Sequence, residues 1–422
     1  MSVYKPEVLR VFIPVGGGAT RLKPLTAETS KACVRILNRP LVEISMMGLA
    51  KQGVRNFIFG VKGFFNYKSL FDYFKEGSGF SARYNVSSGV HIKYSPNIED
   101  VGSADSLRLV MEYYDIKEPI FVIQGDNICD IELQKLISFH EEKKAFATIV
   151  LTNVDDVESY GITMLNEDMR ILKFVEKPKK DEAPSNLAST GLYLFNSEIR
   201  EVFQEQEVQE MIYKKKRLDF GYDLIPYIVK TGRPVYGYVL KGKWFDVGTP
   251  SKYLETVKTL LYGQLKFFRD FGGKLSEEEN IWIQGTSAES LRKREEIIMK
   301  LRMGMIRFEG MVLMGRHCSV GDGVEVVDSC VDNFTVVGDN TKIINSAVLD
   351  RVRIGKNVEI LESIVGRHSN IEISTKIVSS VIGDNVSINE NCIIIGTKIY
   401  PHLRIPLNRK YINQTLQNQE EV

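Results

Sequence analysis

A repeat in the last quarter of the chain constrains the fold more than any other feature of the sequence. A phrase of Val or Ile followed by Gly recurs after about residue 310, and five copies have their glycines at positions 321, 338, 355, 366 and 383. The intervals between successive glycines are therefore 17, 17, 11 and 17, and each is a multiple of six that is short by one. β-Branched residues at a fixed period, with turn glycines between them, describe a solenoid whose coils stack their short strands on one another.

The six-residue phrase resembles that of the left-handed parallel β-helix. It predicts such a helix over residues 311–405, followed by a C-terminal tail of residues 406–422. Because an end coil and flat strand faces are open to further pairing, we expect the β-helix to hold a homo-oligomer together and to contribute no chemistry of its own.

Before residue 260 the pattern is different, because strand-like and helix-like segments alternate. The strand-like runs are residues 8–15, 56–61, 119–125, 146–154 and 191–196, and apolar residues at helical spacing occur in 40–52, 104–114 and 134–144. Such alternation is typical of βαβ units, whose ligands bind beyond the carboxyl ends of the strands. The fold class is therefore α/β, with a Rossmann-like, mostly parallel sheet and helices on both faces.

The alternation and the repeat together predict the domain organisation. An N-terminal domain covers residues 1–260, and a helical connector of residues 261–310 leads to the β-helix. Within the connector, Thr286 and Glu289 have the spacing of a capping box at the start of a helix.

Composition excludes several classes of function. The 55 basic and 54 acidic residues give a net charge of +1, which argues against non-specific binding of nucleic acid. The five cysteines form no C-x-x-C pair, so neither a disulfide framework nor a thiolate zinc site is expected. Apolar runs are too short to cross a membrane, and the opening MSVYKPEV lacks the apolar core of a signal peptide. We expect a cytoplasmic protein with no nucleic-acid or membrane partner.

A glycine-rich loop, GGGATRLKPLT, follows the first strand-like run. It is not a Walker loop, because Gly-Lys-Ser/Thr is absent, and it lacks the third glycine of the dinucleotide fingerprint. Glycines would let backbone N–H groups approach phosphate oxygens, and Arg21 would add a bidentate donor. Taken alone, such a loop is as consistent with a tight connection as with a phosphate site.

Other fragments decide between these interpretations. The sequence resembles the sugar-1-phosphate nucleotidylyltransferases, whose loop reads approximately G-G-x-G-T-R-L-x-P-L-T followed by Pro-Lys. The matching residues here are Gly16, Gly17, Thr20, Arg21, Leu22, Pro24, Leu25, Thr26 and Lys31. G-S-A-D-S-L, Q-G-D-N, V-E-K-P, T-G-L-Y-L-F and W-F-D-V-G-T-P follow in the family's order. The resemblance covers about residues 8–260, and six motifs in order are a strong signal.

The resemblance implies transfer of a nucleotidyl group from an NTP to a hexose 1-phosphate, with Mg²⁺, giving an NDP-sugar and pyrophosphate. Arg21 and the loop amides would bind the β- and γ-phosphates of the NTP, and Lys31 would reach its α- and β-phosphates. The residues implied for nucleotide binding are Gly16, Gly17, Gly18, Ala19, Thr20, Arg21, Lys31, Gly102 and Ser103. The segment PNIEDVGSADSL, residues 96–107, would approach the base.

The remaining implied roles concern the sugar phosphate and the metal. Lys177 would hold the sugar phosphate, and Glu176 would accept hydrogen bonds from sugar hydroxyls. The sugar-phosphate residues implied are Tyr160, Gly161, Glu176, Lys177, Ser189 and Thr190. Asp126 and Asp246 would bind Mg²⁺, and Arg21, Lys31 and Asp126 would be catalytic. Two further acids, Asp130 and Asp223, are interpreted as helix caps, although the family also has an acidic residue at the position of Asp223.

Three positions depart from the family pattern. Ala19 replaces a loop glycine, Ser30 stands where a proline usually precedes Lys31, and Ser189 replaces an asparagine. They affect the expected backbone approach to phosphate and one sugar contact, but not the reaction class.

The substrates and a second activity stay open at this point. The V-G-G opening and the β-helix slightly favour mannose 1-phosphate with GTP, and glucose 1-phosphate with UTP or dTTP follows closely. His317 and His368 both occur as Gly-Arg-His in the β-helix and would be the residues of an acetyltransferase in a bifunctional enzyme. A catalytically silent regulatory subunit is a further alternative, although the implied catalytic residues are all present.

Overall fold

The computed structural model of the protein describes residues 5–96, 99–268, 271–276 and 280–422. These residues form two compact units. The first consists of the chain up to Gly17 together with Val42–Trp244, and the second consists of Gly18–Leu41 together with Phe245–Val422. The glycine-rich loop is therefore divided, and most of it belongs to the unit that contains the β-helix. No helix in the described part of the chain is long and apolar enough to span a membrane.

The first unit is built on a nine-stranded sheet, in the order β10-β9-β11-β6-β1-β4-β5, with β8 bound to β11 and β12 bound to β8. Its strands are β1 (Arg10–Val15), β4 (Asn56–Val61), β5 (His91–Pro96), β6 (Ile120–Ile123), β8 (Ala147–Asn153), β9 (Gly161–Leu165), β10 (Ile171–Glu176), β11 (Leu187–Phe195) and β12 (Val235–Val239). Strands β6, β1, β4 and β5 run parallel, as do β8 and β12, whereas β11 is antiparallel to its neighbours. The expected α/β class is confirmed.

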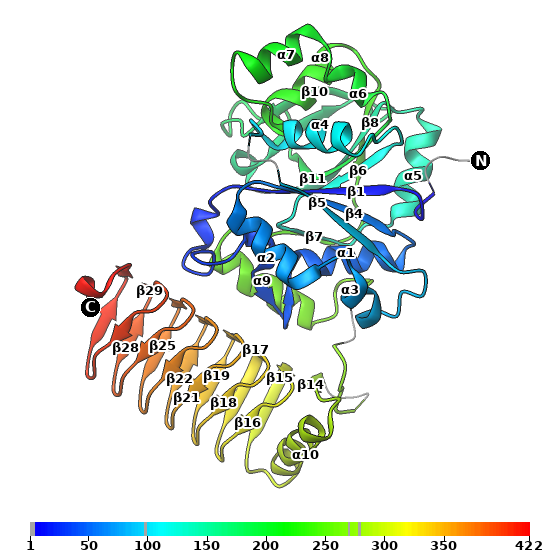
Figure 1. The fold of residues 1–422 in the computed structure, drawn as a ribbon. Helices are drawn as coiled ribbons and strands as arrows, with labels where there is room; N and C mark the ends of the chain where they lie inside the picture. Colours follow the sequence, from blue (N-terminus) through cyan, green and yellow to red (C-terminus); the bar gives the residue numbers. More distant parts are fainter. Residues whose placement is uncertain (1–4, 97–98, 269–270, 277–279) are drawn as a thin grey trace. The chain divides into compact units, whose positions relative to one another are not determined.

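Helices cover both faces of this sheet, as expected. Figure 1 shows α4 on one face and α1 and α2 on the other. The helices are α1 (Leu41–Lys51), α2 (Phe64–Phe74), α3 (Ser78–Arg83), α4 (Ser103–Tyr113), α5 (Leu133–Glu142), α6 (Ile199–Val202), α7 (Gln206–Tyr213) and α8 (Ile225–Lys230). Strand β1 reads RVFIPV and is buried from its second residue onward, as a central strand covered on both faces requires.

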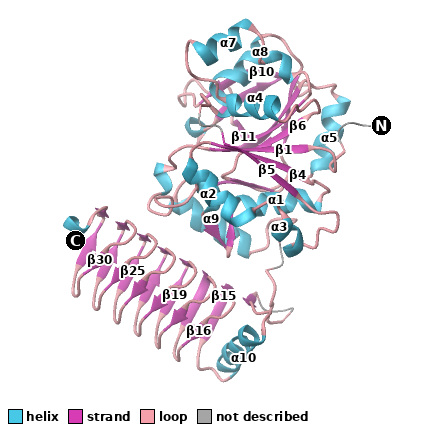
Figure 2. Ribbon diagram, in the orientation of Figure 1, coloured by secondary structure: helices cyan, strands magenta, loops and turns pink. Residues whose placement is uncertain are grey.

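The second unit is dominated by the β-helix, in which successive coils stack short parallel strands, as the predicted left-handed β-helix requires (Figure 2). Its strands are β15 (Arg307–Met314), β16 (Ser319–Val320), β17 (Glu325–Val331), β18 (Val336–Val337), β19 (Lys342–Ile344), β20 (Ala347–Val348), β21 (Arg353–Ile354), β22 (Glu359–Leu361), β23 (Ile364–Val365), β24 (Asn370–Ile371), β25 (Lys376–Val378), β26 (Val381–Ile382), β27 (Ser387–Ile388), β28 (Ile393–Ile395), β29 (Lys398–Ile399), β30 (Arg404–Ile405), β31 (Lys410–Ile412) and β32 (Thr415–Leu416).

The strand register explains the uneven glycine spacing of the repeat. Val337 pairs with Ile354 and Ile354 with Ile371, so one coil on this face advances the sequence by 17. On another face, Val348 pairs with Val365 at the same interval of 17. The shorter interval between Gly355 and Gly366 is thus a change of face within a coil, and the coil length does not change there.

A row of buried hydroxyls satisfies backbone groups inside the β-helix. Ser329, Ser346, Ser363, Ser380 and Thr397 occupy equivalent positions in successive coils and are at most 1 % exposed. The Ser329 hydroxyl accepts the Ser346 amide at 3.0 Å, and the Ser346 hydroxyl accepts the Ser363 amide at the same distance. Because buried polar groups destabilise a fold unless they are paired, this row allows polar residues inside a stack of Val and Ile.

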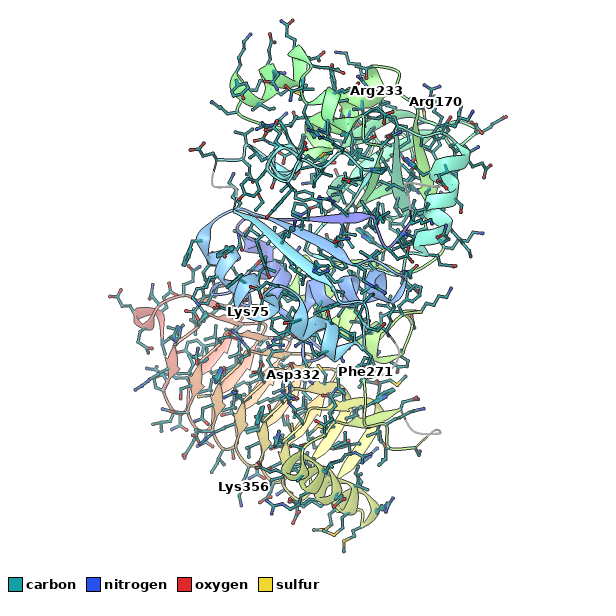
Figure 3. The ribbon with its side chains drawn as sticks, turned by 45° about the vertical axis from the view of Figure 1, so that its right-hand side comes forward. Lys75, Arg170, Arg233, Phe271, Asp332 and Lys356 are labelled. Atoms are coloured by element: carbon teal, nitrogen blue, oxygen red, sulfur yellow. The ribbon has the colours of Figure 1, made fainter. Side chains whose placement is uncertain are left out.

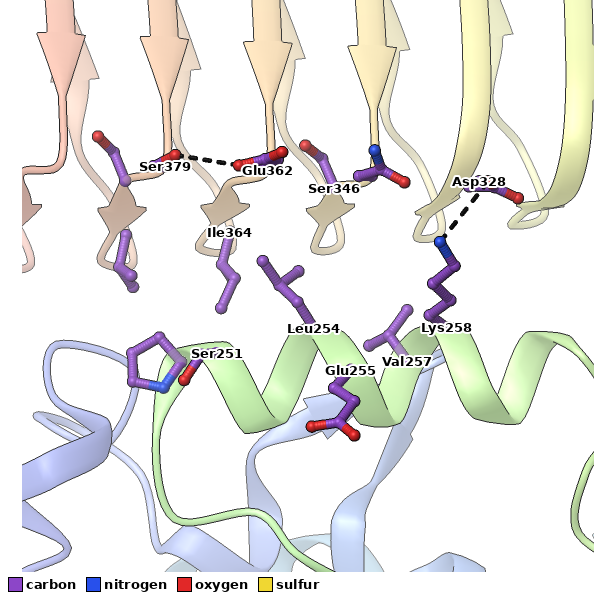
Figure 4. Close-up of a pocket in the computed structure, with 14 residues that line it drawn as sticks. Ser251, Leu254, Glu255, Val257, Lys258, Asp328, Ser346, Glu362, Ile364 and Ser379 are labelled. Carbon is purple, nitrogen blue, oxygen red and sulfur yellow. Dashed lines mark hydrogen bonds and ion pairs between the residues drawn. The ribbon is translucent and has the colours of Figure 1, made fainter.

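The rest of the second unit comprises α9 (Pro250–Leu261), β14 (Ile281–Ile283) and α10 (Ala288–Arg302). Figure 4 shows α9 beside the corners of several coils, where Lys258 lies 4.0 Å from Asp328. The capping box of α10 is formed by Ser287 and Ser290. The position predicted for it from the sequence, at Thr286 and Glu289, is wrong by one residue. The Ser290 hydroxyl accepts the Ser287 amide at 2.9 Å, which fixes the start of the helix.

Asp332, at the end of the coil that contains β17, is a fully buried carboxyl group (Figure 3). Burial raises its pKa to about 8, the Asp350 carboxylate adds to the rise, and the guanidinium groups of Arg35 and Arg39 oppose it. The proton is therefore retained in the folded state at pH values where an exposed aspartate has lost it.

We predict that Asp332→Asn stabilises the protein increasingly as the pH rises. With a folded pKa near 8, Asp332 in the wild type costs up to ~1.4 kcal/mol for each pH unit between about 4 and about 8. Asparagine does not titrate, so the variant and the wild type should have similar Tm values near pH 4.5. The gap should widen by several degrees at pH 8, measured by calorimetry. A gap that does not depend on pH would contradict the raised pKa.

Candidate active site

The carboxyl ends of the parallel strands β1, β4 and β6 lie at one edge of the sheet, and two of the nucleotide motifs follow these ends in the sequence. Gly16 follows β1, Lys62 follows β4, and a turn containing Asp126 follows β6. The backbone is closely packed here, since a Cβ added to Gly16 would lie 3.3 Å from the Cβ of Lys62. One added to Gly125 would lie 3.0 Å from a methyl group of Val15. The glycines therefore bring the first residue of the loop, Gly16, and the Asp126 turn to one edge of the sheet, where α/β sheets bind ligands.

Lys62 is a cation at this edge that the sequence motifs did not identify. Its Nζ lies 3.0 Å from the Asp100 carboxylate and donates to the Asp100 carbonyl at 2.8 Å. Half of the Lys62 side chain is exposed, whereas Asp100 is buried and its pKa is raised by burial. Only its position directly after a buried strand could have pointed to Lys62 in the sequence.

A bulge in β11 places Ser189 and Thr190 next to the Asp126 turn. Gly191 takes a left-handed conformation with φ 78°, and a Cβ there would lie 2.6 Å from the Gln124 side chain. The Thr190 carbonyl accepts hydrogen bonds from the Asn127 amide group and, at 3.0 Å, from the Trp244 indole. Ser189 and Thr190 are both buried, and the Thr190 hydroxyl donates to the Val150 carbonyl at 2.8 Å. Their hydroxyls thus support the bulge from inside the unit.

Glu176 and Lys177 lie at the end of β10. Glu176 is largely buried, and burial raises the pKa of its carboxyl group while Lys177 opposes the rise. Two glycines make room for this carboxylate: a Cβ on Gly161 would lie 2.6 Å from it, and one on Gly221 would overlap it. Lys177 is half exposed, with its Nζ 3.9 Å from Glu176.

Aromatic rings border this acid–base pair on two sides. The Lys177 Nζ lies over the ring of Tyr222, 5.6 Å from its centre, and Tyr160 packs edge-on against Trp244 at 5.2 Å. The backbone amide of Lys177 donates to the Tyr160 carbonyl at 2.9 Å, which ties the two predicted sugar residues together. Tyr222 and Trp244 were not among the predicted site residues.

Gly102 and Ser103 begin α4 and are engaged by a neighbouring segment. The Ser103 amide donates to the Asp219 carboxylate at 3.1 Å, and its hydroxyl accepts the Phe220 amide at 3.2 Å. A Cβ on Gly102 would lie 2.5 Å from the Leu218 carbonyl oxygen. The absence of a side chain at Gly102 therefore lets the backbone at Leu218 approach closely. Of the segment expected to approach the base, residues 97 and 98 lie outside the described residues.

In the second unit, the loop from Gly18 is closed on itself. Ala19 is left-handed, with φ 41° and ψ 41°, and its carbonyl accepts the Thr26 hydroxyl at 2.8 Å. A glycine would adopt this conformation without strain, whereas alanine is disfavoured there by about 1 kcal/mol. The departure of Ala19 from the family pattern is thus tolerated because Thr26 holds the turn.

Three of the predicted charged residues meet around Gly248 in this unit. The Lys31 Nζ lies 3.5 Å from the Asp246 carboxylate, and both side chains are largely buried. A Cβ on Gly248 would lie 3.3 Å from the Arg21 guanidinium and 3.3 Å from Asp246. Two cations therefore gather near one carboxylate, in a loop whose residues Gly18 and Arg21 face solvent. Such an arrangement can bind a polyanion and stabilise charge that develops on it.

Neither of the two acids interpreted as caps is the N-cap residue of a helix. The N-cap of α5 is Glu132, so the capping prediction for Asp130 is wrong. Asp223 is buried and paired with Arg217 through contacts of 2.8–3.2 Å, and it also accepts the Asp219 amide at 2.9 Å. It stabilises the backbone around residues 217–223 from within a short π-helix, Phe220–Leu224.

The histidines of the β-helix occupy one repeating corner. His317, Phe334, Arg351 and His368 follow one another at the interval of one coil, and each is left-handed at the same turn. The His317 ring stacks on Phe334 at 4.7 Å, and the Arg351 guanidinium lies 5.2 Å from the centre of the Phe334 ring. The two histidines thus occupy equivalent turns of the β-helix, 51 positions apart in sequence.

A resident metal site made by the protein alone is not seen among the described residues, because no three or more His, Cys, Asp or Glu side chains assemble. The predicted pair, Asp126 and Asp246, would supply two carboxylates. That donor set fits Mg²⁺, which commonly takes one or two carboxylates and completes its shell with water and substrate phosphates.

Comparison with known proteins agrees with these motifs and this fold. The model of a family described as Nucleotidyl transferase matches residues 11–262, and a model described as GMPPB C-terminal domain matches residues 308–415. The chain belongs to the nucleotidyl transferase family. The family resemblance seen in the loop and strand-end motifs is thereby confirmed.

Named relatives in the nucleotidyl transferase family act on different sugars. A UTP–glucose-1-phosphate uridylyltransferase of Synechocystis is 27% identical over 81% of this chain and 81% of its own length. A mannose-1-phosphate guanyltransferase of Debaryomyces hansenii is 32% identical over 60% of this chain and 64% of its own length. A solved UDP-glucose pyrophosphorylase, complexed with UDP-glucose, has a TM-score of 0.51 and 24% identity, covering 60% of this chain and 99% of that one. The last comparison supports the fold.

Proposed function

We propose that the protein transfers a nucleotidyl group from an NTP to a hexose 1-phosphate. An oxygen of the sugar phosphate attacks the α-phosphorus in line, and a new P–O bond forms as the bond to the bridging oxygen of the β-phosphate breaks. Pyrophosphate leaves, and an NDP-sugar remains. Both reactants are anions, so the site has to neutralise charge and align them. The observation that carries the proposal is the gathering of Arg21 and Lys31 beside Asp246 in a family member's phosphate loop.

The loop residues have separate tasks in this reaction. Arg21, exposed next to Gly248, would bind the leaving β- and γ-phosphates, and the amides of Gly16–Thr20 would add donors. Lys31, held at 3.5 Å by Asp246, would contact the α-phosphate region, where charge changes most. The pairing with Asp246 keeps the ammonium group oriented before a nucleotide binds.

Glu176 and Lys177 would serve the sugar phosphate. Lys177 is half exposed and restrained by Tyr222, so it would reach a phosphate without leaving its place above the ring. The partly buried Glu176 would accept hydrogen bonds from sugar hydroxyls, in the space that Gly161 and Gly221 leave open. Ser189 and Thr190 would act indirectly on the sugar phosphate, by holding the bulge of β11 in place.

Asp126 and Asp246 would hold Mg²⁺ together with the substrate phosphates. A bound Mg²⁺ supplies positive charge that offsets the repulsion between the reacting anions. The charge that the chain itself adds comes from Arg21, Lys31 and Lys177, and Lys62 at the strand edge contributes a fourth cation.

Mannose 1-phosphate with GTP is our first candidate pair, since a guanyltransferase relative and the GMPPB-type C-terminal match support it. Glucose 1-phosphate with UTP or dTTP is the second, supported by the longer alignment with the uridylyltransferase. The test is a panel of four NTPs against mannose, glucose and N-acetylglucosamine 1-phosphates, scored by pyrophosphate release. Absence of turnover throughout would favour a silent regulatory subunit. We further propose that the protein is a cytoplasmic homo-oligomer joined through the β-helix.

We predict that loss of Lys177 and loss of Arg21 have separable effects. Lys177→Ala should chiefly raise KM for the sugar phosphate, because its contact with that phosphate is present in the ground state. Arg21→Ala should chiefly lower kcat, by about a hundredfold, because it stabilises charge developing on pyrophosphate. Initial-rate kinetics with each substrate varied in turn would measure both. Lys173→Ala, at an exposed lysine of the same strand β10, is the matched control. Equal effects of both changes on both substrates would refute the division of roles.

The metal assignment is tested with Asp126→Asn and Asp246→Asn. Each change keeps the side-chain shape but removes a charge that the metal needs, so kcat should fall at least about a hundredfold. Pyrophosphate release is measured against Mg²⁺ concentration, with Asp168→Asn at an exposed aspartate as the control. Folding of Asp126→Asn should survive, since a partly exposed carboxylate in a turn contributes little to stability. Asp246 is largely buried beside Lys31, so the Tm of Asp246→Asn is measured alongside its turnover. A variant that keeps near wild-type turnover at limiting Mg²⁺ would show that its residue is not a ligand.

A further inference from the structure

The chain that follows the phosphate loop lies along one corner of the β-helix. A hairpin of β2 (Arg35–Ile36) and β3 (Arg39–Pro40) is joined by two left-handed residues, Leu37 with φ 49° and Asn38 with φ 68°. Two left-handed residues in succession are typical of a type I′ turn, whose twist matches that of the two strands of a hairpin. Both ends of the segment Glu28–Pro40 contact β-helix residues, and these residues are four coils apart.

Asn38 fixes the hairpin end of this segment. Its side-chain carbonyl accepts the backbone amide of Asn333, at a corner of the β-helix, at 3.1 Å. Its amide group donates to the side chain of Gln284, which follows β14, at 3.2 Å. One side chain thus joins the hairpin to two other elements of the second unit.

Further contacts hold the remainder of the segment. The buried Tyr253 of α9 donates its hydroxyl to the Arg35 carbonyl at 2.5 Å. At the opposite end, Glu28 lies 2.7 Å from His402. The buried Asp332 adjoins Asn333 and carries an electrostatic interaction with Arg35. Because parallel strands are about 4.8 Å apart, the contacts at Asn333 and His402 are separated by roughly 19 Å of β-helix.

Short-range hydrogen bonds connect this anchored segment to Lys31. The Val34 amide donates to the Lys31 carbonyl at 3.2 Å, and the Leu41 amide donates to the Val34 carbonyl at 3.0 Å. Lys31 itself begins a single 3₁₀ turn, Lys31–Cys33, and its Nζ reaches Asp246. A shift of the hairpin would therefore move the backbone that carries the Lys31 ammonium group.

We propose that Asn38 is a positioning residue for the transfer reaction: it fastens the segment after the phosphate loop to the β-helix and thereby places Lys31. The β-helix does no chemistry in this arrangement, but it supports residues that do. The kinetic part of this inference rests on the proposed function, whereas the fastening itself does not.

The test uses Asn38→Gly in the full chain. Glycine keeps the left-handed turn without strain and removes the side chain that makes both contacts. The KM for the NTP should rise, or kcat should fall, by about tenfold or more, because small displacements of a catalytic group are costly, while the KM for the sugar phosphate stays unchanged. The matched control is Asn340→Gly, at a left-handed asparagine of the β-helix whose side chain contacts Asn357.

A second readout is independent of activity. Trypsin can cut after Lys31 and after Arg35, but Arg39 is followed by Pro40 and is protected. Cleavage after Lys31 and Arg35, followed by mass spectrometry, should be several times faster in Asn38→Gly than in the wild type or in Asn340→Gly. Accelerated cleavage in a protein that shows no turnover with any substrate would support the fastening while the proposed function fails.

His402→Ala keeps the proposal testable if Asn38→Gly does not fold, since the His402 side chain is largely exposed. It removes the contact at the other end and should also accelerate cleavage after Lys31. Unchanged cleavage in both variants would overturn the fastening. Accelerated cleavage with unchanged NTP kinetics, or an equal rise in KM for both substrates, would overturn the positioning of Lys31.

Discussion

The structure depends on holding the irregular loop that carries Arg21 and Lys31. The loop Gly18–Leu41 has only single 3₁₀ turns and one short hairpin, so its backbone order has to come from contacts elsewhere. Thr26 closes its first turn and Asp246 orients Lys31. The hairpin end contacts the β-helix through Asn38. The loop can therefore present exposed donors to an anion without the conformational freedom that a free loop would have to lose on binding.

Glycines position charge at this site by leaving space. Glu176 can be buried at the end of β10 because Gly161 and Gly221 have no side chains there. Arg21 and Asp246 come close because Gly248 lies between them. At each of these three positions an added methyl group would push against a charged side chain. Glycine is therefore required there because of the neighbouring charged residue, and not because of the glycine's own backbone conformation. Burial also has a cost at Glu176. It raises the pKa of the carboxyl group, because the charged form is less well solvated there than in water.

The sequence predicted the parts whose signals are local and missed those that depend on distant contacts. The periodic glycines and the alternating strands predicted both folds, because periodicity reports burial directly. The motif residues Lys31 and Asp246 do come together, although 215 positions separate them in sequence. Lys62, Tyr222 and the hairpin contacts carry no motif, and Asn38 meets Asn333 across 295 positions. The prediction for the cap of α10 was displaced by one residue because Thr286 and Ser287 are both favourable N-cap residues, and the T-x-x-E spacing pointed to the first of them.

A β-helix suits the task of support because its geometry is repetitive and its coils are bonded throughout. Each coil pairs with its neighbours at a constant interval of 17, and buried Ser and Thr hydroxyls join successive turns. Corner residues therefore recur at fixed spacing along one direction, with no hinge between them. A loop that contacts the corner at Asn333 and again at His402 is held at two points of one continuously hydrogen-bonded stack of coils. A contact at one point alone would leave the loop free to pivot, whereas two separated contacts also fix the direction in which Lys31 is presented.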